Sequence, residues 1–263
     1  MINEYKRLSS HIDIEKLCKC GIGYVDAADC SWYHRNWMVL RNLDIVSNPF
    51  WHQCFYEQHL NEYASHPDSK NLVLGTADFS MPYLCKQIGI SKLYISDICP
   101  TPLNICSAIA LKEGFDWQTF SCDARQGIAS QYNLIVNDAF LTRFNCVEKR
   151  YVLAHIGQAL ISGGKFVTTI RKGWNSGEPL VPSRSEKESF VRNAMDLAQN
   201  YSRSLVEKSA RQYIEKMTSY PIKDEDSLVS LCDGIFSIAY LSAISTPGEC
   251  VESTYFEVVF MKK

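Results

Sequence analysis

The sequence predicts an α/β fold with a mostly parallel sheet of about seven strands. From residue 71 onward, short apolar runs alternate with helical stretches, which is the pattern of βαβ units. Two further strand-like runs close the chain, whereas the first 70 residues contain no convincing strand. We therefore expect an N-terminal helical cap over 1–70 and one α/β domain over 71–263.

The cap is expected to consist of helices rich in aromatic side chains. Helical patterns cover 2–18, 31–46 and 50–64. The polar segment HPDSK at 66–70 contains a proline and marks a short boundary before the first strand. Aromatic side chains at helical spacing can be ordinary core or can line a binding site.

The α/β domain is expected to begin with five strands separated by helices. The strand candidates are NLVLG at 71–75, KLYIS at 92–96, WQTFSC at 117–122, YNLIVN at 132–137 and GKFVTTI at 164–170. Helical stretches lie between them at 81–88, 102–113 and 147–161. This alternation predicts right-handed crossovers and helices on both faces of the sheet.

The last third of the chain is expected to add helices and an antiparallel hairpin. A loop rich in Gly, Pro and Ser covers 172–185, and helical patterns follow within 186–200, 203–217 and 224–233. The runs FSIAYLSAI at 236–244 and TYFEVVFM at 254–261 are joined by a turn-rich connection. Such a pair of runs predicts a C-terminal hairpin.

Composition narrows the classes of partner. The chain has 263 residues, 46% of them hydrophobic, and a formal net charge of −2. That balance gives no electrostatic reason to expect nucleic acid or an anionic membrane as a partner. The first residues are polar, and no stretch approaches ~18 uninterrupted apolar residues. We therefore expect a cytoplasmic protein with no membrane contact, and the oligomeric state is left open.

The cysteines indicate reduced thiols and no metal site. The chain has 11 cysteines, an odd number, scattered singly and often inside apolar runs. Only Cys18 and Cys20 lie close together, and no second pair or histidine follows them at the spacing of a zinc site. The expectation is therefore that no metal is bound.

Polar residues follow the predicted strands, where ligands bind in open parallel sheets. Gly75 permits a tight turn after the first strand, and Asp97 lies 22 residues beyond it, at the spacing of a ribose-binding carboxylate. After the third strand, Asp123 can accept from an adenine amino group, and the Ala124 N–H can donate to a ring nitrogen. Asn137 and Asp138 end the fourth strand.

These features resemble class I S-adenosylmethionine-dependent methyltransferases, which have a Rossmann-like sheet. The likeness covers about 71–263 and includes the acidic residues after strands 2 and 3, a polar-aromatic element NDAF after strand 4, the segment ALISGGKFVTTIR and the terminal hairpin. It implies that S-adenosylmethionine lies over the turn after strand 1, with Asp97 on the ribose and Asp123 on the adenine end.

The first turn departs from the family pattern. It has Gly75 alone, in GTADF, where the family usually has G-x-G-x-G. Asp78 is then expected to take the amino group of the cofactor, and Thr76 or Ser80 its carboxylate. The missing glycines argue against a dinucleotide, whose pyrophosphate needs close backbone approach. NDAF differs from the NPPY-like element of nucleic-acid amino-methyltransferases, which favours a small-molecule acceptor.

The acceptor is expected between the fourth strand and the cap. Asn137 and Asp138 are the candidate catalytic residues, which position the acceptor, and Asn137 is also a candidate cofactor-binding residue. An aromatic face stabilises a sulfonium cation. The candidate substrate-binding residues are Trp32, Tyr33, Trp37, Tyr56, Arg171 and Trp174. His34 and His52 lie beside these aromatics and are either general bases or structural histidines.

The function predicted from the sequence is a methyltransferase that acts on a small-molecule acceptor. Two alternatives stay open. The same cofactor can undergo another reaction, such as intramolecular cyclisation in azetidine-2-carboxylate synthases, which have a methyltransferase-like fold. The chain can also be a non-catalytic module that binds S-adenosylmethionine.

Overall fold

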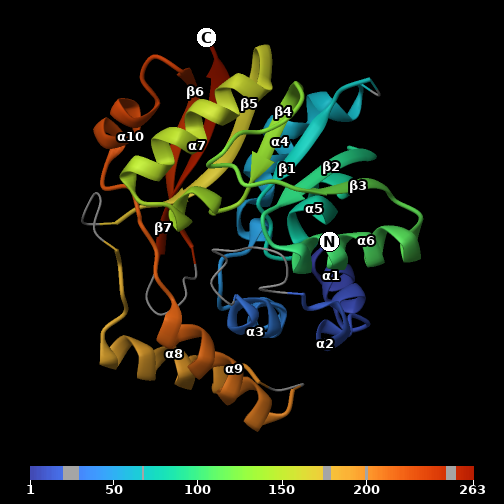
Figure 1. Ribbon diagram of the computed structural model, residues 1–263. Coiled ribbons are helices and arrows are strands. Elements are labelled where there is room, and N and C mark those ends of the chain that lie inside the picture. Colours follow the sequence, from blue (N-terminus) through green and yellow to red (C-terminus); the bar gives the residue numbers. More distant parts are fainter. Residues whose placement is uncertain (20–29, 67, 174–178, 199–200, 247–252) are drawn as a thin grey trace.

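The computed structural model describes residues 1–19, 30–66, 68–173, 179–198, 201–246 and 253–263. Their strands form one seven-stranded sheet in the order β3-β2-β1-β4-β5-β7-β6 (Figure 1). The strands are β1 Asn71–Leu74, β2 Lys92–Asp97, β3 Asp116–Ser121, β4 Tyr132–Asn137, β5 Leu160–Arg171, β6 Phe236–Thr246 and β7 Ser253–Lys262. The first five pair in parallel, and β7 pairs antiparallel with both β5 and β6. All seven predicted strands and the terminal hairpin are thereby confirmed.

Helices occupy the predicted intervals, with two corrections. The helices are α1 Ile2–Ser9, α2 Ile14–Leu17, α3 Ser31–Asn42, α4 Gln53–Ala64, α5 Ser80–Ile88, α6 Pro100–Glu113, α7 Cys146–Ala159, α8 Arg184–Asp196, α9 Arg203–Lys216 and α10 Glu225–Cys232, with 3-10 turns at Pro49–His52 and Phe140–Arg143. The predicted helix over 2–18 is broken, because the Asp13 side chain accepts from the Lys16 N–H and starts a new helix there. The helix predicted over 31–46 ends at Asn42, two residues before Asp44 with its φ of 62°.

Alternating strand residues build a separate core on each face of the sheet. Val73 of β1 packs into the core that includes side chains of α1, α4, α5 and α6. Leu72 and Leu74, its neighbours along the strand, pack into the opposite core with α7 and α10. Successive side chains of a strand point to opposite faces, so a run that is apolar throughout belongs in the centre of a covered sheet.

A third core lies beyond the carboxyl ends of the parallel strands. Trp37, Leu40 and Val46, from α3 and the segment after it, pack against Phe190 of α8 and Tyr213 of α9. Figure 1 shows α3, α8 and α9 grouped at one end of the sheet. Among the described residues, α1 and α4 thus contribute to the sheet's own core, whereas α3 packs mainly against helices from the C-terminal third; the predicted boundary at residue 70 stays a prediction.

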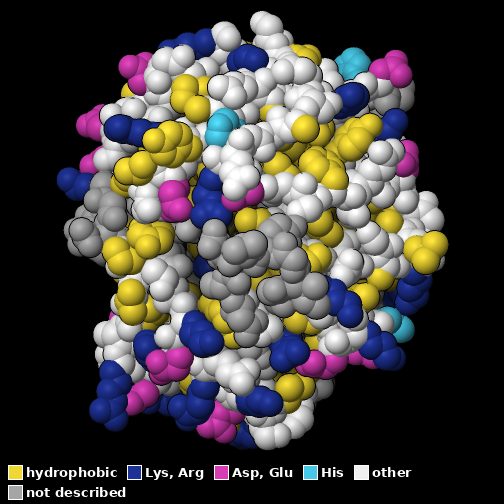
Figure 2. Space-filling view, viewed as in Figure 1, with side chains coloured by type: hydrophobic (Ala, Val, Ile, Leu, Met, Phe, Trp, Pro, Cys, Tyr) yellow, Lys and Arg dark blue, Asp and Glu magenta, His cyan; other side chains and the backbone are white. Residues whose placement is uncertain are grey.

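The visible surface carries charges of both signs. On the face seen in Figure 2, acidic and basic side chains lie interspersed, most densely over the end that α8 and α9 form. Among the described residues, every helix is too short or too polar to span a lipid bilayer.

Candidate functional site

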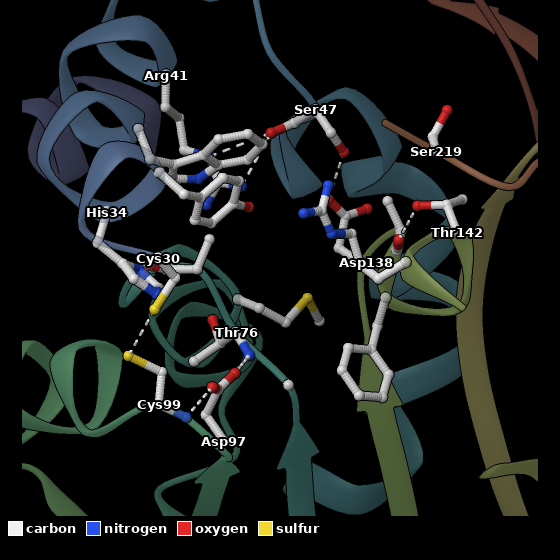
Figure 3. A pocket seen from close by; sticks show the side chains of 18 of the residues that line it. Cys30, His34, Arg41, Ser47, Thr76, Asp97, Cys99, Asp138, Thr142 and Ser219 are labelled. Carbon is white, nitrogen blue, oxygen red and sulfur yellow. Dashed lines mark hydrogen bonds between the residues drawn. The ribbon is translucent and has the colours of Figure 1, made fainter. Parts of the chain in front are cut away.

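A cavity of about 300 Å³ lies between the strand ends and the third core (Figure 3). Its lining residues on the sheet side come from the segments that follow β1, β2, β4 and β5, and those on the helical side come from α3, α9 and the loops beside them. This position agrees with the rule that open parallel sheets bind ligands beyond the carboxyl ends of their strands. The lining includes Cys30, Trp32, Tyr33, His34, Trp37, Arg41, Ser47, Gly75, Thr76, Ser80, Asp97, Ile98, Cys99, Asp138, Phe140, Arg143, Arg171, Tyr213, Met217, Ser219 and Tyr255.

Gly75 forms the floor of the cavity where β1 ends. Its φ of 70° lies in the left-handed region, and a Cβ placed there would come within 2.1 Å of the Phe140 ring. Both facts require glycine at this position. The Gly75 N–H donates to the Ser96 carbonyl at 2.7 Å, which ties the turn to β2. One glycine therefore suffices for a tight turn here.

Asp97 stands at the end of β2 and lines the cavity. One carboxylate oxygen accepts from the Thr76 N–H at 3.0 Å, and the other accepts from the Cys99 N–H at 2.7 Å. Burial raises the pKa of Asp97 to about 6, although these two backbone donors favour its charged form. Each oxygen keeps a second lone pair for a ligand hydroxyl.

Asp138 also lines the cavity and lies apart from Asp97, on the side of Ser47 and Thr142 (Figure 3). Its Oδ1 accepts from the Thr169 hydroxyl at 2.7 Å and its Oδ2 from the Ser47 hydroxyl at 3.0 Å. The preceding residue, Asn137, is fully buried, does not line the cavity, and accepts from the Thr168 hydroxyl at 2.5 Å. Of the two candidate catalytic residues, Asp138 alone is at the cavity surface.

The helical wall is aromatic, and the guanidinium groups of two arginines already contact its rings. Tyr33 and Trp37 stack with ring centroids 4.6 Å apart, and Tyr213 from α9 lies 5.6 Å from Trp37. The Arg143 guanidinium lies 5.3 Å from the Tyr33 ring centroid, and the Arg41 guanidinium lies 4.8 Å from that of Trp37. These contacts have the geometry of cation–π interactions. The predicted residues Trp32, Tyr33 and Trp37 therefore line the cavity together.

A buried ion pair joins this wall to the sheet. The Arg41 guanidinium contacts the Asp78 carboxylate at 2.7 Å, and the Tyr5 hydroxyl donates to the same carboxylate at 2.8 Å. Arg41 also donates to Ser80, which does line the cavity. Asp78 is fully buried and does not line the cavity, so its carboxylate contacts protein groups instead of the space in which the sequence led us to expect a cofactor amine.

Three other candidates lie outside the cavity lining. Asp123 forms an ion pair with Arg125 at 2.9 Å, and the neighbouring Ala124 is buried in the sheet's core. Tyr56 is fully buried, and its hydroxyl donates to the Asn137 carbonyl at 2.8 Å. The expected adenine contacts at the end of β3 are thus not part of this cavity.

Of the remaining candidates, some line the cavity and others do not. Arg171 lines the cavity, whereas Trp174 lies outside the described residues. Of the two histidines, His34 lines the cavity. His52 is buried elsewhere, with Nδ1 3.0 Å from the Glu257 carboxylate, in a structural pairing.

Sequence reasoning missed a cluster of thiols and imidazole at the cavity edge. Cys30 and Cys99 have their sulfur atoms 3.5 Å apart, and His34 lies beside them. The hydrogen bond from Cys30, together with His34, lowers the pKa of the Cys99 thiol well below its usual range. A signal was present, because Cys30 and His34 are four residues apart at the start of a helix and therefore share a face. The expectation of no metal overlooked it by considering Cys18 and Cys20 alone.

Comparisons with known proteins give matches in structure and none in sequence. No family model matches the chain, and no curated protein matches it. Magnesium protoporphyrin IX methyltransferase (ChlM) from Synechocystis PCC 6803, with bound S-adenosylhomocysteine, superposes with a TM-score of 0.54 at 15% identity over 87% of this chain and 94% of that one. The N-methyltransferase NodS from Bradyrhizobium japonicum WM9, also with S-adenosylhomocysteine, superposes with a TM-score of 0.51 at 12% identity over 88% and 98%.

Some similar structures are longer than this chain. The pyocyanin biosynthetic protein PhzM superposes with a TM-score of 0.51 at 12% identity over 87% of this chain. This chain spans 58% of the length of PhzM, and the same share of TehB from Haemophilus influenzae. At these identities the likeness is one of fold. The strand order, the terminal hairpin and these superpositions together show that the chain has the fold of class I S-adenosylmethionine-dependent methyltransferases.

Proposed function

We propose that the chain is an enzyme that binds S-adenosylmethionine and transfers its methyl group to a small-molecule acceptor. The observation that carries this proposal is Asp97, a carboxylate that lines the cavity at the end of β2 in a methyltransferase fold. ChlM and NodS, which share the fold, hold S-adenosylhomocysteine. A carboxylate at this position is suited to accept hydrogen bonds from both hydroxyls of a ribose.

The residues around Asp97 fit a nucleoside. Its two oxygens are oriented by the Thr76 and Cys99 N–H groups, which leaves one lone pair on each for a hydroxyl. Ile98 and Cys99 line the cavity next to it and offer an apolar surface for a base. Because Asp123 and Ala124 do not line the cavity, adenine recognition in this proposal uses the segment after β2 and not the end of β3.

The other half of the cavity suits the amino-acid portion and the acceptor. When bound, S-adenosylmethionine supplies a carbon activated by a sulfonium. Arg171 offers a guanidinium to a carboxylate, and Asp138, held by Thr169 and Ser47, offers an oriented carboxylate to an amine or to an acceptor proton. The aromatic wall of α3 borders this space with apolar surface, and electrostatic interactions strengthen where a bound ligand displaces water.

The size of the cavity limits any acceptor to a small molecule. About 300 Å³ is at the lower end of the range in which proteins bind drug-sized ligands. Helices α3 and α9 border it on the side away from the sheet, so a polymer would have to displace them.

Titration calorimetry with S-adenosylhomocysteine tests the proposed cofactor. We expect micromolar affinity, around −8 kcal/mol. An absence of heat and of any shift in melting temperature at millimolar ligand would contradict S-adenosylmethionine binding. Binding without turnover over a panel of small amines, thiols and carboxylates would instead favour a non-catalytic module.

The same volume also favours a second reaction, intramolecular cyclisation of S-adenosylmethionine. A cavity of about 300 Å³ that holds the whole ligand leaves little room for a second molecule. Incubation with S-adenosylmethionine alone separates the two reactions. Methylthioadenosine formed without an acceptor indicates cyclisation, whereas S-adenosylhomocysteine formed only with an acceptor indicates methyl transfer.

A further inference from the structure

Three soft or borderline metal ligands converge where helix α3 meets the end of β2. Cys30 and His34 come from the start of α3, and Cys99 lies two residues after Asp97 (Figure 3). The two sulfur atoms and a ring nitrogen of His34 all lie within 4.8 Å of one another. All three residues also line the cavity.

The spacing is close to that of a tetrahedral zinc site. Zinc bonds to thiolate sulfur at about 2.3 Å and to imidazole nitrogen at about 2.0 Å, which places the ligand atoms about 3.5–3.8 Å apart. The two sulfur atoms are already 3.5 Å apart. The other separations need a contraction of at most about 1.3 Å, which side-chain rotations supply.

The groups behind the ligands have the arrangement that metal sites use. Nδ1 of His34 lies 3.3 Å from the Ala77 carbonyl oxygen, which can only accept; the tautomer with its proton on Nδ1 makes this hydrogen bond and leaves the Nε2 lone pair for an ion. The Cys99 N–H donates to Asp97 at 2.7 Å, which fixes the backbone beneath the second sulfur. Two of the three ligands are therefore oriented before any ion arrives.

The chemistry of the set selects the ion. Two thiolates and one imidazole favour Zn²⁺ over Mg²⁺ or Ca²⁺, which prefer oxygen ligands. Within the described residues, no fourth histidine, cysteine or carboxylate joins the cluster. Sites with three protein ligands, including two cysteines and one histidine, keep their fourth position for water or substrate.

We propose that Cys30, His34 and Cys99 bind one Zn²⁺ ion whose fourth position opens to the cavity. Binding releases the Cys30 thiol proton, which in the free protein is donated to Cys99, to solvent, and the ion receives an electron pair from each sulfur and from the imidazole. The ion joins α3 to the end of β2 beside Asp97. It therefore links the helical wall of the cavity to the strand-end wall, and its open position is available to a thiol, an amine or a water molecule.

Cobalt substitution tests the site directly, using the full chain reduced with a phosphine and freed of metal with a chelator. Titration with Co²⁺ should give the d–d absorption of tetrahedral cobalt and a sulfur-to-cobalt charge-transfer band, both saturating at one ion per chain. Added Zn²⁺ should then abolish both bands. Cys30→Ser, His34→Ala and Cys99→Ser should each lose the tetrahedral spectrum. Cys54→Ser, which changes an exposed thiol on α4, should keep it.

A second measurement covers variants that fail to fold. In the wild-type chain, Zn²⁺ should slow alkylation of Cys30 by iodoacetamide, followed by peptide mass spectrometry, and should leave the alkylation of Cys54 unchanged. The proposal is overturned if the reduced chain binds no Co²⁺, or if the tetrahedral spectrum survives in Cys99→Ser. It is also overturned if the two thiols form a disulfide on isolation and Zn²⁺ gives Cys30 no protection after reduction. None of these readouts requires S-adenosylmethionine, so they stand apart from the proposed function.

Discussion

The two walls of the cavity differ in chemistry and in how the chain builds them. The strand-end wall carries Gly75, Thr76, Asp97 and Asp138, which are small or acidic and lie at or within two residues of the ends of strands. The helical wall carries aromatic rings and arginines, and its members come from opposite ends of the chain. Tyr33 and Tyr213 have ring centroids 6.3 Å apart although strands β1 to β5 lie between α3 and α9 in the sequence.

This difference shows that one wall follows a local rule and the other follows tertiary packing. A residue after a parallel strand is placed at the sheet edge by the strand itself. The ring of Tyr213, in contrast, reaches the cavity only because α8 and α9 pack on α3 through a separate core. The walls meet at the buried Arg41–Asp78 pair, which is the first place to test their dependence on each other.

Loss of the Asp78 carboxylate should have the largest effect. Asp78→Ala leaves Arg41 buried at 4% exposure without its counter-charge, and breaking such a pair costs ~3–5 kcal/mol. Urea unfolding should show this loss in the free energy of unfolding. Glu188→Gln removes the partner of Arg184 in an exposed pair on α8 and should leave the unfolding midpoint unchanged. Equal midpoints for Asp78→Ala and wild type would show that the walls do not depend on this pair.

The next largest effect is on cofactor affinity, and it should distinguish Asp97 from Asp123. Asp97→Ala should weaken binding of S-adenosylhomocysteine by at least ~2 kcal/mol, or about 30-fold, because two charge-assisted hydrogen bonds are lost. Asp123→Ala is the matched control, since Asp123 follows the neighbouring strand but pairs with Arg125 outside the cavity lining. Calorimetry should find its affinity close to wild type. If Asp123→Ala weakens binding as much, the adenine contact predicted from the sequence is restored.

Affinity should also depend on pH through Asp97. Burial raises the pKa of Asp97 to about 6, so in the free protein this group takes up a proton as pH falls through that value. A protonated carboxyl accepts hydroxyl protons poorly. Affinity should therefore be level above about pH 6 and fall by up to tenfold per pH unit below it, by linkage. Calorimetry on wild type and Asp97→Asn checks this, because the variant should lose the dependence. A wild-type profile that stays level down to about pH 5 would contradict it.

The contrast between the walls explains what the sequence could and could not predict. The strand positions and the place of Asp97 at the end of a strand could be predicted, because apolar periodicity and strand-end spacing are local signals. The same rule did not foresee that Asp123 pairs with its neighbour Arg125, or that Asp78 is buried against Arg41 and Tyr5; the cofactor roles predicted for both stay predictions. Those partners depend on contacts across the fold.

The helical wall shows the same limit. The aromatics of α3 were candidates from their density, but Tyr213 had no local signal, because α9 reads as an ordinary amphipathic helix. Arg41 lies four residues after Trp37 and therefore on the same face of α3, a spacing that the aromatic residues alone did not bring to attention.

The smallest effect concerns the charge preference of the aromatic wall. Tyr33→Leu keeps an apolar side chain in the cavity and removes the ring's attraction for cations. S-adenosylmethionine carries a sulfonium, whereas S-adenosylhomocysteine is a neutral thioether of nearly the same shape. An aromatic face is worth ~0.5–2 kcal/mol to a cation. Because Arg143 already lies 5.3 Å from the Tyr33 ring centroid, an incoming sulfonium competes with it, and the lower part of that range applies.

Tyr33→Leu should therefore weaken S-adenosylmethionine binding by ~0.5–1 kcal/mol more than it weakens S-adenosylhomocysteine binding, a selective loss of about two- to fivefold. Calorimetry with both ligands measures the difference, and Tyr151→Leu, at an exposed tyrosine on α7, provides the control. An equal loss for the two ligands would mean that the ring contributes area and not charge recognition. The helical wall would then differ from the strand-end wall in origin but would have no selectivity of its own for the methyl donor.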